Sequence, residues 1–310
     1  MWLLLDYGLS TVTTPADWPS LIAQLTVADR LFGACGYRLV ADWLNEQVGL
    51  IDDRDFAQSF AEHVDLPGIE VNEYSHRHVR WSEGELLGGI RFYNRDAGRP
   101  FVEVIAHSFD DFAQLRECVQ AEWSKFEPSF LRLRTQPGQL ATTPNAKLHK
   151  SIHAGRYRDL RSPNGRVTLE RFDDLEEAIA LVARRYEWLQ SEDPELARVL
   201  VAASPEELRG WNDAGQLYGV LTTDGTVGLL AIEPSNIGWV KGDEVSEEVI
   251  DAQYCGHGYA AAAQGLWAQQ VAFDRDALLI GTIHASNIAS RKTAETAGRP
   301  RILDDYVVAL

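Results

Sequence analysis

Two glycines separated by a single residue stand where a strand is expected to give way to a helix. The segment reads Tyr254-Cys255-Gly256-His257-Gly258-Tyr259-Ala260. Because glycine adopts backbone angles that are closed to other residues, successive N–H groups there can point into one concavity. The first turn of the following helix adds unpaired N–H groups and the positive end of its dipole. This chemistry suits an anion such as a pyrophosphate, although two glycines alone more often form a simple turn.

The elements around this loop alternate between strands and helices, as the periods of their apolar residues indicate. The predicted order is a strand at 167–172, a helix capped by Asp173 or Asp174, a helix at 205–211 capped by Ser204, strands at 216–222, 227–233 and 247–251, the glycine loop, a helix at 259–273, a strand at 277–283, a helix at 288–297 and a strand at 302–309. A turn at Asp224-Gly225 joins two of these strands into a hairpin. Strands interleaved with single helices imply an α/β domain with a mixed sheet.

Two segments in this order resemble motifs of the GNAT superfamily of acyl-CoA-dependent acyltransferases. The loop is similar to the family's motif Gln/Arg-x-x-Gly-x-Gly/Ala, with Cys255 in the first place, Gly258 at the glycine and Ala260 at the last small position. Residues 287–298, which open with Asn287 and Ser290, are similar to the Asn-x-x-Ser helix of the branch that acetylates ribosomal-protein N-termini. The resemblance covers nearly all of residues 165–310 and implies a GNAT fold there.

The resemblance also implies an acyl-CoA co-substrate, such as acetyl-CoA, and the residues that hold it. Its pantetheine arm would lie against the strand edge of Glu248, Val249 and Ile250, much as an added strand would. The pyrophosphate would sit on the loop and first helical turn, that is on Cys255, Gly256, His257, Gly258, Tyr259, Ala260 and Ala261. Asn287 and Ser290 would face the thioester end. Asn287 is equally well explained as an ordinary helix cap.

Acyl transfer from a thioester needs a neutral amine, a route for its proton, and donors for the oxyanion. The candidates for the proton route are His284, whose intrinsic pKa suits the task, and Glu247 or Glu248 on the preceding strand. A lone strand histidine is more often a structural residue. By the resemblance, Ser290 would protonate the leaving thiolate.

The chain departs from the family pattern at three positions. Cys255 replaces a residue whose side chain normally helps to bind phosphate, so the backbone is expected to carry more of the binding. Many relatives place a glutamate base and a tyrosine acid at the positions of Thr282 and Ala294. The commonest acid and base of the family are therefore absent from their usual places.

The leading hypothesis is an N-acyltransferase that moves an acetyl or short acyl group from acyl-CoA to a small-molecule or peptide amine. The amine would attack directly in a ternary complex. A non-catalytic acyl-CoA sensor or interaction module is the alternative, motivated by the missing acid and base. A third possibility, a relative that uses charged tRNA, is disfavoured because the chain is acidic.

A chain of 310 residues is long enough for two domains. Residues 141–165 are rich in turn residues and lack a sustained period, which predicts a linker between domains at 1–140 and 166–310. In the first half we expect strands at 85–93, 101–106 and 130–134, and a helix at 109–125 capped by Ser108 or Asp110. This run resembles the later one and predicts a degenerate GNAT-like copy. The junction between its strand and helix, residues 106–110, has no glycine, so we expect this copy to bind no phosphate group.

Composition excludes several other classes. The formal net charge of -17 and the absence of a basic stripe argue against nucleic acid as a partner. The three cysteines suggest neither a disulfide framework nor a zinc cluster, and a reducing cytoplasm fits best. We expect no signal peptide, because Asp6 interrupts the apolar start, and no membrane span. His76 and His78 lack an evident third ligand, so no metal site is predicted.

Overall fold

The computed structural model describes residues 14–271 and 274–310, which divide into two compact units. Unit 1 contains the described residues up to Thr135, together with Thr142–Lys147 and Tyr306–Leu310. Unit 2 contains Gln136–Ala141 and Leu148–Asp305. The α/β class with a mixed sheet is confirmed. The N-terminal segment interpreted above, and Phe273 at the end of the predicted glycine-loop helix, lie outside the described residues.

The sheet of unit 2 has the strand order β11-β5-β10-β9-β8-β7-β6. Its strands are β5 (Ala146–Arg156), β6 (Thr168–Glu170), β7 (Leu217–Thr222), β8 (Gly225–Ile237), β9 (Val240–Ile250), β10 (Leu278–His284) and β11 (Arg301–Ala309). Strands β9 and β10 pair in parallel, whereas β6, β7, β8 and β9 form successive antiparallel pairs, as do β5 and β10. The predicted hairpin is confirmed, because β7 and β8 are joined by a tight turn that brings Thr222 opposite Gly225.

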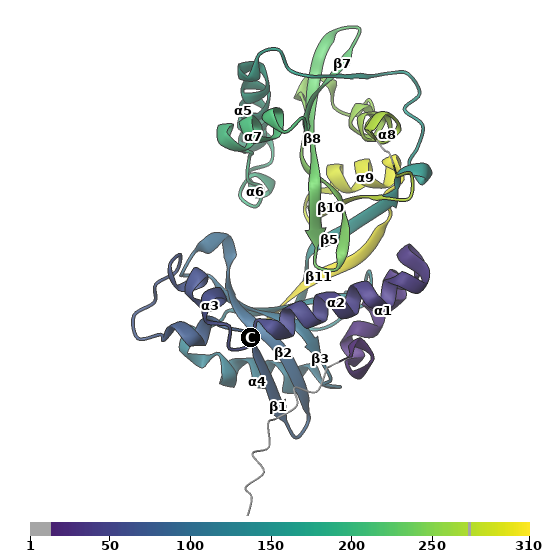
Figure 1. The fold of residues 1–310 in the computed structure, drawn as a ribbon. Coiled ribbons are helices and arrows are strands. Elements are labelled where there is room, and N and C mark those ends of the chain that lie inside the picture. The colour runs from purple at the N-terminus through teal and green to yellow at the C-terminus, as the bar shows by residue number, and fades with distance from the viewer. Residues whose placement is uncertain (1–13, 272–273) are drawn as a thin grey trace, which may run out of the picture. The chain divides into compact units, whose positions relative to one another are not determined.

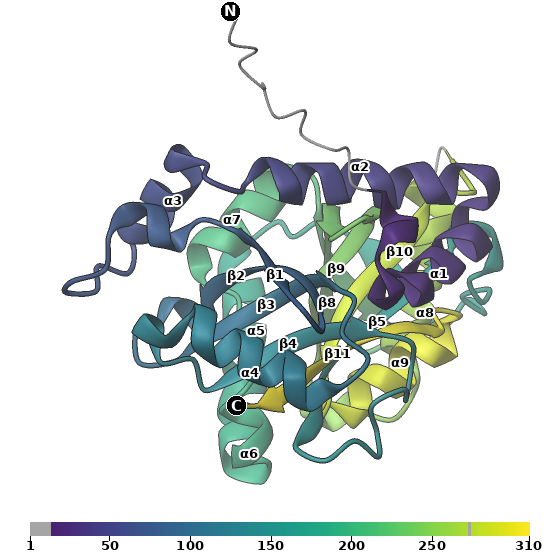
Figure 2. The ribbon, with the colours of Figure 1, turned by 90° about the horizontal axis from the view of Figure 1, so that it is seen from below.

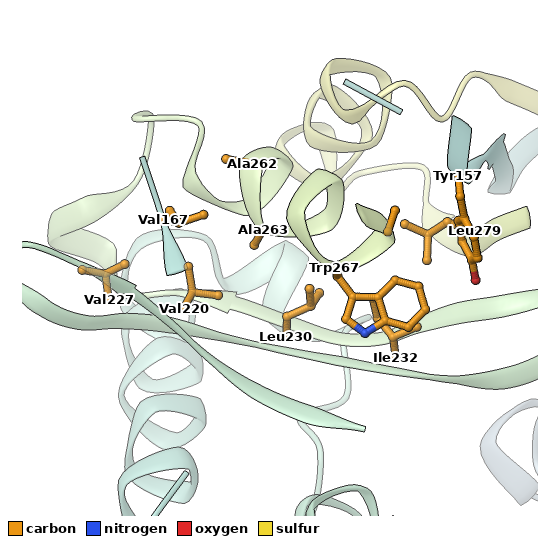
Figure 3. Close-up of a cluster of buried hydrophobic side chains, with 11 residues drawn as sticks. Tyr157, Val167, Val220, Val227, Leu230, Ile232, Ala262, Ala263, Trp267 and Leu279 are labelled. Atoms are coloured by element: carbon orange, nitrogen blue, oxygen red, sulfur yellow. The ribbon is translucent and has the colours of Figure 1, made fainter. Parts of the chain in front are cut away.

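Helices cover both faces of this sheet (Figure 1). One face carries α5 (Leu175–Glu192), α6 (Pro194–Ala197) and α7 (Pro205–Asp213), and the other carries α8 (Tyr259–Val271) and α9 (Ile288–Ala297). On the first face, apolar residues of α5 and α7 pack on buried Leu229 and Val249. On the second, Trp267 of α8 packs near Leu230, Ile232 and Tyr157, as Figure 3 shows. Burial of these apolar side chains holds the helices on the sheet.

Side-chain caps begin the helices of unit 2 where the sequence predicted. Asp174 accepts a hydrogen bond from the Glu176 N–H at 3.0 Å and caps α5. Ser204 and Glu207 form a reciprocal capping box at the start of α7. The short helix α6, which begins after Asp193, was not predicted.

The predicted linker is not an irregular connection. It contains all of β5, and its later residues pack closely against the helices of unit 2. The Arg161 N–H donates to the Ala297 carbonyl at the end of α9 at 2.9 Å. A Cβ atom at Gly265 of α8 would lie 2.2 Å from the Arg161 carbonyl oxygen. The strand was missed because turn residues flank it and because its polar face, with His149, Ser151 and His153, is buried, which the sequence does not reveal.

Unit 1 has the strand order β1-β2-β3-β4, and its C-terminal residues return to it, with the Leu310 N–H donating to the Ser129 carbonyl. Its elements are α1 (Ile22–Phe32), α2 (Gly36–Gly49), α3 (Arg54–Ala61), β1 (Arg77–Trp81), β2 (Gly84–Phe92), β3 (Pro100–His107), α4 (Phe112–Glu122) and β4 (Phe130–Thr135). Figure 2 shows α2 on one face of these strands and α4 on the other. Leu44 of α2 packs on Leu87 and Ile105.

Strands β3 and β4 of unit 1 pair in parallel around α4, as β9 and β10 do around α8. The predicted caps of α4 were wrong, because Asp111 accepts the hydrogen bond from the Ala113 N–H. Ser108 instead accepts one from the Glu85 N–H at 2.8 Å. Phe109 is buried, and a Cβ atom at Gly84 would lie 2.9 Å from its ring. An aromatic side chain therefore fills the junction between β3 and α4.

The other residues singled out in the sequence have structural partners. The His76 ring lies 3.0 Å from the Gln47 carbonyl, and His78 lies 2.8 Å from the Glu85 carboxylate. Among residues 14–271 and 274–310, no group of three potential ligands is arranged to hold a metal ion. The same residues include no helix that is both long and apolar enough to cross a bilayer.

The packing of Gly265 leads to a stability test. Replacing Gly265 by Ala should lower the free energy of unfolding by about 1–3 kcal/mol, because the new methyl group meets the backbone of Arg161. Gly210, inside α7, has open space around its Cβ position, so Gly210→Ala should raise stability by up to about 1 kcal/mol. Urea denaturation measures both. Equal stability of Gly265→Ala and the native chain would contradict this close contact.

Candidate functional site

The glycine loop has backbone N–H groups that donate to no acceptor in the described chain. It follows the single turn Ala252–Tyr254, and Gly256 and Gly258 have φ values of 83° and 76°. A Cβ atom at either glycine would meet nothing within 4 Å. The Gly258 carbonyl accepts from the Ala262 N–H at 3.1 Å, so Gly258 is the residue from which α8 starts. Within the described chain, no group accepts a hydrogen bond from the N–H of Gly256 or Gly258, whereas His257 closes a hydrogen-bonded turn.

A cavity of about 370 Å³, here called the loop cavity, opens beside these donors. Most of the predicted cofactor residues line it, namely Glu248, Ile250, Cys255, Gly256, Gly258, Tyr259, Ala260 and Ala261. His257 does not line it, and its exposed ring lies 5.5 Å from that of Tyr259 in a stacked arrangement. Two cations, Arg185 and Lys292, also line the cavity. The cavity therefore offers backbone N–H groups, a helix N-terminus and the Lys292 ammonium to an anion.

The Cys255 side chain contacts the backbone at the end of β9. Its thiol lies 3.6 Å from the Ile250 carbonyl oxygen and 3.7 Å from that of Asp251, within reach of weak hydrogen bonds. The same side chain lines the loop cavity.

Strands β9 and β10 separate soon after they meet. Among the described residues, their parallel pairing is limited to Leu279 with Asp243 and Ile280 with Glu244. Beyond this point β9 continues to pair only with β8, up to Ile250. The edge of β9 that faces β10 is therefore open over residues 245–250.

A chain of buried polar side chains crosses this gap. Arg299 donates to the Ile280 carbonyl at 3.0 Å and to the Gln264 side-chain oxygen at 2.9 Å. Gln264 in turn donates to the Glu248 carboxylate at 2.7 Å. Burial lowers the pKa of Arg299 to about 10 and raises the pKa of Glu248. Gly281 leaves the room for the guanidinium, since a Cβ there would lie 2.9 Å from it.

A second cavity, of about 240 Å³ and here called the strand cavity, lies along β9 and β10. The three predicted catalytic residues all line it, as do Val249 and Asn287. They are Glu247, His284 and Ser290. The loop and strand cavities share four wall residues, which are Arg185, Glu248, Ala289 and Ser290. The two spaces therefore meet at the gap between β9 and β10.

Glu247 is the acidic residue best placed for proton transfer. It is buried, and burial raises the pKa of its carboxyl to about 7, with a smaller contribution from the charge of Glu248. Its two oxygens accept from the Ala203 N–H at 3.0 Å and the Glu248 N–H at 3.2 Å. These bonds fix the carboxyl in place at the cavity wall. A base with a pKa near neutrality is suited to take a proton from an amine.

His284 is less well placed for that task. Its Nδ1 lies 2.7 Å from the Ser286 hydroxyl and accepts from the Ser286 N–H at 3.3 Å. Burial and the charge of Lys150 lower its pKa. The nitrogen that a neutral imidazole would use to accept a proton is therefore already engaged within the protein.

Asn287 and Ser290 occupy the first turn of α9. The Asn287 side-chain oxygen accepts from the Ser290 N–H at 3.0 Å, so Asn287 caps the helix while it also lines the strand cavity. Ser290 lies where the two cavities meet. Its hydroxyl is therefore available at the junction between loop and strand cavities.

A third cavity, of about 360 Å³, continues from the strand cavity and is here called the acidic cavity. Its wall includes four carboxylate residues, Glu207, Glu233, Glu244 and Glu247, together with Trp211. It shares Val201, Val245, Ser246, Glu247 and Thr282 with the strand cavity. The site is thus a series of three connected spaces within unit 2.

Sequence reasoning missed two features of this site. Arg185 and Lys292 lie on α5 and α9, and only the fold brings them to the loop. A β-bulge at Ser246 shifts the register, with Val245 opposite Ile232 and Glu247 opposite Ala231. The sequence gave no sign that Arg185 of α5 lines a cavity, because charged side chains on a helix are usually solvated.

Comparison with known proteins gives structural neighbours only. No protein-family model and no curated protein sequence matches the chain. An acetyltransferase from the GNAT family from Colwellia psychrerythraea is similar at 9% identity and a TM-score of 0.45, over 83% of this chain and 95% of that one. A GCN5-related N-acetyltransferase from Sphaerobacter thermophilus is similar at 13% identity and a TM-score of 0.46, over 95% and 92%.

A tandem GNAT protein from the clavulanic acid biosynthesis pathway is similar at 13% identity and a TM-score of 0.42, over 88% of this chain and 95% of that one. These names describe those proteins. The function proposed for this chain rests on the residues of the site.

The raised pKa of Glu247 predicts how stability depends on pH. The folded state keeps the carboxyl proton up to about pH 7, whereas the unfolded chain loses it near its ordinary pKa of 4.5. The unfolded state therefore binds fewer protons between these values, and the free energy of unfolding falls as pH rises. Glu247→Gln removes the titrating group. The variant should therefore avoid a loss on the order of 3 kcal/mol in the free energy of unfolding, which the native chain undergoes between about pH 4.5 and about pH 7.

Urea denaturation at about pH 4.5 and about pH 8 tests this, with the exposed Glu187→Gln as the matched control. The stability difference between Glu247→Gln and the native chain should grow with pH. A difference that stays constant would show that the carboxyl ionises normally in the folded protein.

Proposed function

We propose that unit 2 is an N-acyltransferase of the GNAT type, which moves an acetyl or short acyl group from acyl-CoA to an amine. The observation that carries this proposal is the meeting of the loop cavity and the strand cavity at the gap between β9 and β10. An anion site on one side and a buried carboxyl on the other thereby open into one space. The motif resemblance at residues 254–260 and 287–298 supports the same assignment.

The residues of the loop cavity would bind the co-substrate. The N–H groups of Gly256 and Gly258 and the start of α8 would receive its pyrophosphate, with Lys292 nearby. The open edge of β9 would pair with its amide-containing arm. This leaves the thioester at the junction of the two cavities, beside Ser290.

The residues of the strand cavity would then serve the chemistry. The amine nitrogen forms a bond to the thioester carbonyl carbon and gives its proton to Glu247, while the carbon–sulfur bond breaks. Ser290 donates a proton to the departing sulfur and regains one from solvent. Holding the two reactants together in one direct-attack complex would supply much of the rate.

Binding of acetyl-CoA is the first test. Isothermal titration should show binding to the native chain, and Gly258→Ala should weaken it about tenfold or more. An alanine at a φ of 76° costs about 1–2 kcal/mol, which the loop would relieve by turning its N–H groups away.

The matched control is Gly225→Ala, which introduces the same kind of backbone strain, at a φ of 97°, in the turn between β7 and β8. Gly225 lines none of the three cavities. Its variant should bind acetyl-CoA like the native chain. Absence of heat with folded native protein, or native affinity in Gly258→Ala, would contradict the assignment of the loop.

Turnover is the second test, measured as release of free CoA thiol across a panel of amines. Glu247→Gln should lower kcat by about 10²–10⁴ while acetyl-CoA affinity is retained, because it removes the general base. The native rate should rise with pH through about 7 as the carboxyl ionises, and the variant should lose this dependence.

His284→Gln is the comparison in this experiment. A larger loss there than in Glu247→Gln would transfer the role of base to His284. Acetyl-CoA binding without thiol release above hydrolysis, for every amine tested, would instead identify an acyl-CoA sensor.

A further inference from the structure

Arg185 is a cation in the site with a buried nitrogen from which no described protein group accepts a hydrogen bond. Its Nη1 atom is buried and has no hydrogen-bond partner in the described part of the chain. A buried N–H of a charged group without a partner is costly, so its presence calls for an acceptor that is not part of the protein. Arg185 lines both the loop cavity and the strand cavity. The missing acceptor would therefore lie at their junction.

The guanidinium of Arg185 is held in a defined orientation. Its central carbon lies 4.5 Å from the centre of the Trp188 ring, one turn along α5. Stacking on an aromatic face fixes the plane of the guanidinium and leaves its N–H edge free. That edge matches the two oxygens of a carboxylate.

The strand cavity places this cation and the Glu247 carboxyl on the walls of one space of about 240 Å³. Among the described residues, no salt bridge joins the two groups; Glu247 is bonded to backbone N–H groups and to the Tyr186 hydroxyl. A cation and a carboxyl that face one small cavity without pairing suit a ligand carrying both charges. Apolar side chains of Leu189, Leu196 and Leu200 form another part of the wall.

We infer that the acceptor is a free α-amino acid, whose carboxylate pairs with Arg185 while its amine faces Glu247. This inference rests on the acyltransferase function proposed above and names its substrate class. The amino-acid side chain would lie against the leucines of the strand cavity, with the acidic cavity as further room. Bidentate pairing at Arg185 would fix the position of the amine relative to the thioester.

The test compares amino acids with their carboxamides, which keep the amine and the side chain but lack the negative charge. Thiol release from acetyl-CoA is measured with the native chain for a panel of such pairs. We expect kcat/KM to be about ten- to a hundredfold higher for the amino acids, chiefly through a lower KM. Arg185→Met should abolish this preference, and Arg185→Lys should restore part of it.

Arg184→Met is the matched control, because Arg184 precedes Arg185 on α5 but pairs with Asp251 at 3.5 Å and lines neither cavity. It should keep the native preference. Isothermal titration with acetyl-CoA should give the same affinity for Arg185→Met as for the native chain.

Three results would overturn the inference while leaving the acyltransferase function intact. The first is equal turnover of amino acids and carboxamides by the native chain. The second is weaker acetyl-CoA binding by Arg185→Met with the preference retained, which would make Arg185 a co-substrate contact. The third is an equal fall in kcat for every amine, which would make it an oxyanion donor. Absence of turnover with all amines would contradict the proposed function itself.

Discussion

The site depends on β9 leaving β10 after two paired residues. Strands that part must find other partners for their backbone groups, or the polar atoms are left buried and unsatisfied. Arg299 takes the Ile280 carbonyl, and Gln264 links its guanidinium to the Glu248 carboxylate. The gap is therefore held open by a specific chain of buried side chains. Because the loop and strand cavities share wall residues there, this bonding shapes the place where the proposed anion site adjoins the carboxyl of Glu247.

The same crossover of strand, helix and strand occurs in unit 1 with a different outcome. Strands β3 and β4 pair in parallel around α4, but their junction carries Ser108 and Phe109 in place of glycines. The serine hydroxyl accepts a hydrogen bond from the Glu85 N–H, and the Phe109 ring packs beside Gly84. Parallel topology alone thus does not leave a glycine loop beside an open cavity. The residues of the loop decide whether the backbone donors at the helix start face open space or protein.

Features that depend on residues close together in the sequence, such as helix caps, were predictable. Features that depend on how strands and helices pack against one another were not. The bounds of α9 were predicted because Asn287 caps its start and Gly298, with a φ of 99°, ends it. The first half of β9 was missed, since its charged side chains hide the strand. The bulge at Ser246 is visible only once β8 lies alongside. Likewise the loop was found from its glycines, whereas Arg185 reaches it only through tertiary packing.

The bulge at Ser246 also bears on the missing glutamate of the family pattern. Many relatives in the resembling family carry a glutamate base at the position of Thr282 on β10, and Thr282 lines the same strand and acidic cavities as Glu247 on β9. The extra residue in β9 puts Glu247 on the face that carries buried Val249, where burial raises the carboxyl pKa to about 7. A carboxyl therefore enters the same space from the neighbouring strand. Since proton transfer depends on where the group lies and on its pKa, a site with threonine at position 282 still holds a carboxyl that could serve as the proposed general base.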